Sequence, residues 1–174
     1  MTDLLATDDR DARLHAAVED VLLNGGWESP PKSADEALGL IAMAAHDLMG
    51  CRRDPGIAAV ALRQIVVAAA WVIQLRSMAA LACSERDARW VYLHPLIESA
   101  DLNGDDDPRS FAEAVGQIGA CVVSLAAASP WPFNDDPDPF VPVGACALRA
   151  LADLEGMPGR RAAAAAARSK EVPA

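Results

Sequence analysis

The sequence has few aromatic side chains and a shortage of positive charge. Aromatic residues make up 5% of the 174 residues, so a hydrophobic core has to be built from Ala, Val, Leu and Ile. The 15 Lys and Arg residues face 25 Asp and Glu residues, which gives a formal net charge of −10. Because contacts to phosphate require a basic surface, this charge excludes nonspecific binding to nucleic acid.

The four cysteines, Cys51, Cys83, Cys121 and Cys146, are far apart and form no Cys-x-x-Cys motif. None of the three histidines has a second His or Cys one helical turn further along. These absences exclude the common zinc-site patterns. Most of the cysteines fall in apolar helical segments, where Cys behaves as a small hydrophobic residue. We therefore predict structural thiols in a reducing cytoplasm, with no metal site and no cofactor.

No stretch of the sequence predicts a membrane span. The chain carries Asp3 before any apolar run, unlike a signal peptide. The most hydrophobic stretch, 57–83, is interrupted by Arg63 and Arg76, and the uncharged run 114–134 contains glycines and prolines. We expect a cytoplasmic protein that binds neither membranes nor nucleic acid.

The sequence does contain strong helical periodicity. Apolar residues recur at three- and four-residue spacing in the segments 8–24, 34–51, 57–83, 84–102, 110–128 and 143–155. The stretch 57–83 is apolar nearly all round, which is typical of a buried central helix. The pattern predicts an all-α bundle of about six helices in one domain, 1–156, followed by an Ala-rich tail, 157–174, that frays.

One nine-residue segment occurs twice in altered form. The segment 33–41 (SADEALGLI) resembles 110–118 (SFAEAVGQI), and both begin with the Ser-x-x-Glu capping box. The tripeptide Ala-Leu-Arg also occurs in the third and in the sixth helical segment. These echoes predict an internal duplication, with chance similarity in an Ala-rich chain as the alternative. The two halves would span about 8–100 and 108–156.

The first copy of that segment carries a resemblance to a known family. Seven residues carry this resemblance. Ser33, Glu36, Ala37 and Gly39 lie at the start of the second helical segment, and Val67, Ala68 and Ala69 lie within the third. Over about 27–75 the chain resembles the MazG-type all-α nucleotide pyrophosphohydrolases, especially short phage-borne forms. The resemblance implies a Mg²⁺ site of several carboxylates that acts on a nucleoside triphosphate.

The acids of that family are largely missing here. The resemblance places them at Met43, Ala44 and Asp47, of which only Asp47 is an acid. The next helix has Arg63 and Gln64 where the family adds further acids. A single carboxylate binds Mg²⁺ too weakly in water for this chemistry. The resemblance therefore implies a degenerate bundle without catalytic activity.

An acidic segment between the halves has the spacing of a calcium loop, with oxygen ligands at alternating positions. The candidate ligands are Asp101, Asn103, Asp105 and Asp107. Asp106 stands where such a loop needs Gly, and Ala112 stands where it needs a bidentate Glu. These departures favour a solvated linker whose acids precede a helix N-terminus.

Aromatic side chains in the Pro-rich segment 129–142 are candidates for partner binding. Trp131 and Phe133 would form an exposed knob that anchors an interface. The alternative is that they hold this segment against the body of the protein. Gly116 and Gly119 lie inside the fifth helical segment, where we expect them to permit close helix packing.

The residues favour a noncatalytic scaffold or interaction protein, and the resemblance implies a phage or mobile-element origin. We expect a homodimer that associates through 57–83, and a protein partner is compatible with the aromatic knob. One alternative is an active Mg²⁺-dependent nucleotide pyrophosphohydrolase that uses Glu36 and Asp47. The other is a regulatory protein that binds a small molecule in the bundle core.

Overall fold

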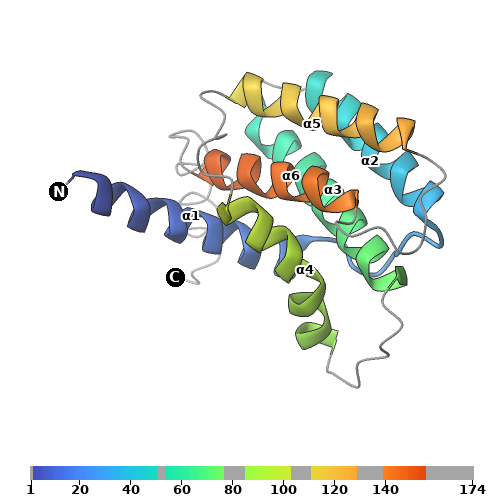
Figure 1. Ribbon diagram of the computed structural model, residues 1–174, viewed down its shortest axis with the longest axis horizontal. Helices are drawn as coiled ribbons and strands as arrows, with labels where there is room; N and C mark the ends of the chain where they lie inside the picture. Colours follow the sequence, from blue (N-terminus) through green and yellow to red (C-terminus); the bar gives the residue numbers. More distant parts are fainter. Residues whose placement is uncertain (1, 51–53, 77–84, 103–110, 129–138, 156–174) are drawn as a thin grey trace, which may run out of the picture.

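The computed structural model describes residues 2–50, 54–76, 85–102, 111–128 and 139–155. They form α1 (Thr2–Asn24), α2 (Ala34–Gly50), α3 (Pro55–Arg76), α4 (Glu85–Leu102), α5 (Phe111–Ala127) and α6 (Phe140–Glu155) (Figure 1). No strand occurs among these residues. The predicted all-α bundle of about six helices is confirmed.

α3 and α6 pack against each other at the centre of the bundle. α2 and α5 cover one side of this pair, whereas α1 and α4 lie on the other side (Figure 1). The core is mostly aliphatic and includes Leu62 and Ile65 of α3 and Leu148 and Leu151 of α6, all fully buried. No polar or charged side chain is fully buried in the described part of the chain. α3 is thus a core helix, as its nearly continuous apolar pattern predicts.

The Ser-x-x-Glu segment at the start of α2 forms a variant of the predicted capping box. The backbone N–H of Glu36 donates to Ser33 Oγ over 3.1 Å, which satisfies a helix N-terminal donor. The Glu36 carboxylate accepts from the backbone N–H of Lys32 over 2.8 Å. A standard capping box would use the backbone N–H of the cap residue, Ser33, as this donor. The cap fixes where α2 begins.

α3 begins with Asp54 as its cap and Pro55 as its first residue. Asp54 Oδ1 accepts from the backbone N–H groups of Gly56, at 2.9 Å, and Ile57, at 3.3 Å. A backbone N–H at the first helical position would have no partner within the helix. Proline, which lacks this N–H, is therefore favoured there. The two caps fix where α2 and α3 begin, and the two helices pack against each other.

Two helices are longer than the sequence predicts. α1 begins at Thr2 rather than at residue 8, because Leu4, Leu5 and Ala6 are good helix formers even without an apolar stripe. α6 begins at Phe140 rather than at residue 143. Pro142 is compatible with a first turn, whose N–H groups have no helical partner. Phe140, predicted to lie in a loop, is fully buried in the core.

α4 continues through Pro95, although proline inside a helix usually breaks or kinks it. Leu93 and Leu96, on either side of the proline, are fully buried. Figure 1 shows a change of direction along α4, as expected where a helix loses a backbone hydrogen bond. Burial on both sides of Pro95 explains why the helix resumes.

The expectation that Gly116 and Gly119 permit close helix packing is wrong. No atom outside the local helix lies within 4 Å of where a Cβ would be at either position. The close contact is at Gly144 of α6 instead, where a Cβ would lie 2.7 Å from Leu96 Cδ2 and 3.0 Å from Ala69 Cβ. Gly144 therefore brings α3, α4 and α6 together.

One helix among the described residues is long and apolar enough to cross a membrane: Pro55–Ile73 of α3. Most of it is buried inside the bundle, as is usual for the core helix of a globular protein. The interruption by Arg63 does not prevent the segment from passing this test, contrary to the expectation from the sequence.

The proposed duplication stays a prediction. α2 and α5 both start directly after the serine of their Ser-x-x-Glu segment, at Ala34 and Phe111. The division of the chain into domains also stays a prediction, and the Ala-rich tail lies outside the described residues.

Candidate functional site

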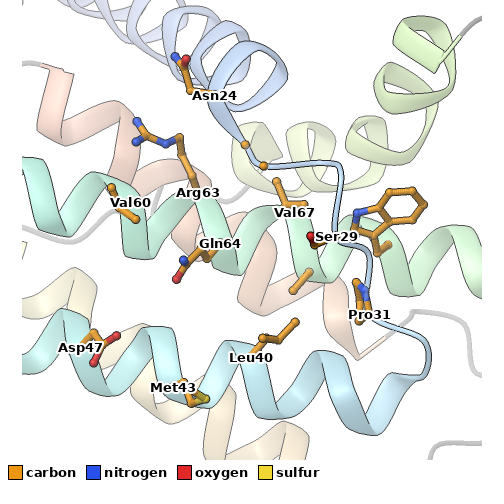
Figure 2. Close-up of a pocket in the computed structure, with 14 residues that line it drawn as sticks. Asn24, Ser29, Pro31, Leu40, Met43, Asp47, Val60, Arg63, Gln64 and Val67 are labelled. Atoms are coloured by element: carbon orange, nitrogen blue, oxygen red, sulfur yellow. The ribbon is translucent and has the colours of Figure 1, made fainter.

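A groove of about 570 Å³ runs between α2 and α3 and is bounded at one side by the end of α1 and the α1–α2 connection. Figure 2 shows Leu40, Met43 and Asp47 along α2, facing Val60 and Gln64 of α3. The lining comprises Asn24, Gly25, Gly26, Ser29, Pro31, Leu40, Met43, Asp47, Val60, Arg63, Gln64, Val67, Ala68 and Trp71.

The walls of the groove combine exposed side chains of α2 and α3 with Val67 and Ala68, which belong to the core. α2 buries Ile41 and Leu48, while its other stripe presents Met43 with 67% of its surface exposed. On α3, Val60 is 46% exposed, and Ile57 beside it is equally open. The sequence marks this face of α3 as apolar and predicts it to be buried or in an interface. The structure instead leaves its first half open to the groove.

A bidentate ion pair joins the groove to α1. Arg63 Nη1 donates to both carboxylate oxygens of Asp20, at 3.0 and 3.2 Å, and the two side chains are 18% and 15% exposed. Asn24 Nδ2 adds a 2.9 Å hydrogen bond to Asp20 Oδ1. Figure 2 shows Arg63 extending from α3 toward the end of α1. The only cationic side chain among the described lining residues is thus already neutralised.

The end of α1 is fixed by a tryptophan that folds back onto it. Trp27 Nε1 donates to the carbonyl oxygen of Val21 over 2.9 Å, and the Trp27 ring lies against Trp71 with centroids 5.9 Å apart. Gly26 has φ of 68°, a left-handed conformation that ends α1. Gly25 is needed because a side chain there would collide with Val21 and Val67.

Trp71 lines the groove and carries a hydrogen-bond donor without a partner. Its Nε1 atom is buried and has no hydrogen-bond partner among the described residues. A buried donor without a partner costs about 1–3 kcal/mol. Gln64, exposed on the same face, adds a flexible amide.

The acids named from the sequence are not brought together. Asp47 lines the groove and is exposed, with His46 Nδ1 3.9 Å from its Oδ1. Met43 also lines the groove, whereas Ala44 is buried in the core. Glu36 caps α2 three turns away, about 16 Å along the helix axis from Asp47.

No group of three or more His, Cys, Asp and Glu side chains in the described part of the chain could hold a metal ion. Asp101 belongs to α4, but Asn103, Asp105 and Asp107 lie outside the described residues, so the calcium loop stays untested. The partner-binding candidates Trp131 and Phe133 also lie outside them.

No family model, no curated protein and no solved structure matches this chain. The MazG resemblance therefore stays a prediction. The site rests on its own geometry.

Sequence reasoning missed the features that depend on distant contacts. Asp20 and Arg63 are 43 positions apart, and no local motif links them. Val60, Gln64, Val67 and Trp71 recur at helical spacing in the sequence and so share one face of a helix. Whether this face borders a groove depends on which elements pack beside α3. Gly25 and Gly26, just before Trp27, are the one local signal that a helix ends there, and the end of α1 forms one wall of the groove.

Proposed function

We propose that this protein is a noncatalytic binding protein and that the groove between α2 and α3 is its binding site. The observation that carries the proposal is an apolar groove of about 570 Å³ with a buried, unpartnered donor at Trp71 Nε1. Small-molecule sites are typically apolar concavities of 300–1,000 Å³ with a few polar groups that orient the ligand. The groove has this size and this combination.

The charges of the lining favour a neutral or cationic amphiphile as the ligand. Asp47 contributes one exposed carboxylate, and Arg63 is occupied by Asp20. A nucleoside triphosphate would bring several negative charges next to Asp47 without a free cation to receive them. The apolar part of the ligand would contact Leu40, Val60 and Val67, and an acceptor would reach the indole N–H.

This proposal keeps the interpretation of a degenerate MazG-like bundle. In the groove, Met43, Arg63 and Gln64 occupy the positions that the resemblance assigns to acids, and Asp47 is the single carboxylate. Mg²⁺ needs several oxygen ligands to bind usefully. Purified protein should release no pyrophosphate from a panel of nucleoside triphosphates with Mg²⁺. Turnover that Asp47→Ala abolishes would support the active-enzyme alternative instead.

The binding test uses Nile red, a neutral dye whose fluorescence rises in apolar surroundings. Val60→Asp places a charge in the groove, and Val91→Asp is the matched control, because Val91 of α4 is 45% exposed but lies outside the groove. We expect Val60→Asp to weaken dye binding about tenfold or more, since a carboxylate is costly to desolvate. Equal dye affinity in the two variants would refute the site.

Self-association is a second candidate, favoured by exposed apolar residues at the same groove. Leu40, Met43 and Val60 line the groove and are exposed, as is Ile57 one turn before Val60 on α3, and clustered apolar surface often marks an interface. Light scattering over a dilution series should then show a homodimer that Val60→Asp dissociates. A constant mass of 18.3 kDa would contradict the dimer and leave the groove free for a ligand.

A cytoplasmic location and a phage or mobile-element origin stay predictions.

A further inference from the structure

Two cysteines that are distant in the sequence meet between α5 and α6. Cys121 Sγ and Cys146 Sγ lie 3.8 Å apart although the residues are separated by 25 positions. Both side chains are partly exposed, so small reagents can reach them. Arg149, one turn further along α6, donates from Nη2 to Cys146 Sγ over 3.5 Å. The cluster is separate from the groove, whose lining contains neither cysteine.

The surroundings of the two thiols differ in a way that suits redox chemistry. The hydrogen bond from Cys121, together with the positive charge and hydrogen bond of Arg149, lowers the pKa of Cys146 to about 6. The same thiol–thiol hydrogen bond and burial raise the pKa of Cys121 well above its usual range. The opposite directions of the two pKa shifts favour Cys146 as the thiolate and Cys121 as the thiol that donates to it. The thiolate is the nucleophile in cysteine chemistry.

We propose that Cys121 and Cys146 form a redox-active dithiol, in which Cys146 reacts with hydrogen peroxide and Cys121 resolves the product to a disulfide between α5 and α6. This function is independent of the groove. It replaces the expectation of structural thiols for Cys121 and Cys146 with a reaction that the spacing of the cysteines does not indicate.

The proposed oxidation has two steps, which together consume one hydrogen peroxide molecule. The Cys146 thiolate attacks one oxygen of H₂O₂ and the O–O bond breaks, which yields Cys146 sulfenic acid and hydroxide, which takes a solvent proton. The sulfur of Cys121 then attacks the sulfur of Cys146, the S–O bond breaks, and the hydroxyl leaves as water with the proton of Cys121. The two sulfurs lose two electrons in total, and the peroxide is reduced to two water molecules.

The geometry permits the second step without rearranging the bundle. A disulfide needs a sulfur–sulfur distance of about 2.05 Å, so the two atoms must approach by roughly 1.8 Å. Rotation of the side chains and small shifts of two packed helices supply movements of that size. Arg149 acts as a positioning residue because it holds the Cys146 sulfur and stabilises its negative charge.

The test begins with the unmodified full chain. After treatment with hydrogen peroxide, we expect peptide mapping by mass spectrometry to show one cross-linked pair, Cys121–Cys146, that dithiothreitol reverses. Closing this loop should also raise the Tm by about 5–10 °C. Oxygen added to either sulfur without a cross-link, or oxidation confined to the other cysteines, would overturn the proposal. This measurement needs no variant to fold.

Variants then assign the roles. In a Cys51→Ser, Cys83→Ser background, Cys121→Ser should leave Cys146 as a sulfenic acid that dimedone traps. Cys146→Ser in the same background should leave a thiol that peroxide oxidises at least about tenfold more slowly, because it is not ionised at neutral pH. Equal oxidation rates in the two variants would refute Cys146 as the attacking thiol. Circular dichroism confirms beforehand that each variant is helical.

Discussion

Gly25→Ala is the substitution that should most directly disturb the wall of the groove. A Cβ at this position would lie 2.7 Å from Val67 Cγ2 and 2.8 Å from Trp27 Nε1, and closer still to the carbonyl oxygen of Val21. The last two atoms are the donor and acceptor of the buried hydrogen bond that holds Trp27 against α1. One methyl group thus enters a filled space and separates a hydrogen-bonded pair.

The expected loss follows from these two effects. Overpacking costs about 1–3 kcal/mol, and leaving a buried donor unpaired costs about 1–3 kcal/mol more. Because the effects share the same atoms and are not additive, we expect a loss of about 3 kcal/mol. For a chain of this length that corresponds to a fall in Tm of about 6–12 °C. Trp27 would also become more exposed, so its fluorescence should shift to the red.

Gly39→Ala is the matched control in the same measurement. Gly39 lies inside α2, and nothing is within 4 Å of its Cβ position, so Ala should stabilise the helix by about 0.5–1 kcal/mol. Urea unfolding followed by circular dichroism gives the free energy of both variants at unchanged m-value. If Gly25→Ala lies within about 0.5 kcal/mol of Gly39→Ala, the close packing at the end of α1 is refuted.

Three further predictions concern other contacts. Arg63→Met, which removes the ion pair to α1, should cost about 1.5–3 kcal/mol in urea unfolding, and an unchanged midpoint would show that the pair contributes nothing. Gly144→Ala should cost about 1–2 kcal/mol, less than Gly25→Ala because the Leu96 methyl groups that it meets can rotate; a gain in stability would contradict the packing. Alkylation of Cys146 by iodoacetamide should rise with pH through about 6, following its lowered pKa, and a midpoint near 9 would contradict the thiolate.

The parts of the fold that sequence could predict are those decided by local chemistry. Ser33 and Asp54 cap their helices because the capping hydrogen bonds span only a few residues. The apolar stripe of α2 faces the core at the spacing that the sequence shows. In contrast, Phe140 joins α6 against the appearance of a Pro-rich loop, because burial in the core outweighs local composition.

The site could be predicted only in part for the same reason. The sequence singles out Met43 and Asp47 as positions that the resemblance assigns to acids, but whether they border a groove depends on where α1 ends. That end is set by Trp27, which bonds back to Val21, and by the ion pair of Arg63, whose partner no local pattern identifies. Distant pairs of this kind become visible only when the chain is folded.

The predicted duplication gives a physical reason for comparing the groove with the thiol pair. In the structure α2 contacts α5, and α3 contacts α6. Contacts between corresponding elements are what a two-fold relation between the halves predicts, because elements near the axis meet their own copies. The two echoes in the sequence align α2 with α5 and α3 with α6. Under that alignment, Arg149 corresponds to Arg63, which forms an ion pair with α1 instead of contacting a thiol.

The same alignment predicts that a second thiol pair can be built. Cys121 corresponds to Ala44 and Cys146 to Val60, so Ala44→Cys with Val60→Cys should place two thiols together between α2 and α3. In a background with the natural cysteines replaced by Ser, peroxide should cross-link this pair, whereas Ala42→Cys with Val60→Cys should not react, because Ala42 is exposed on a different face of α2. Failure of Ala44→Cys with Val60→Cys to cross-link while the Cys121–Cys146 pair does would mean that the two helix pairs pack differently. The resemblance between the halves would then be a product of the Ala-rich composition.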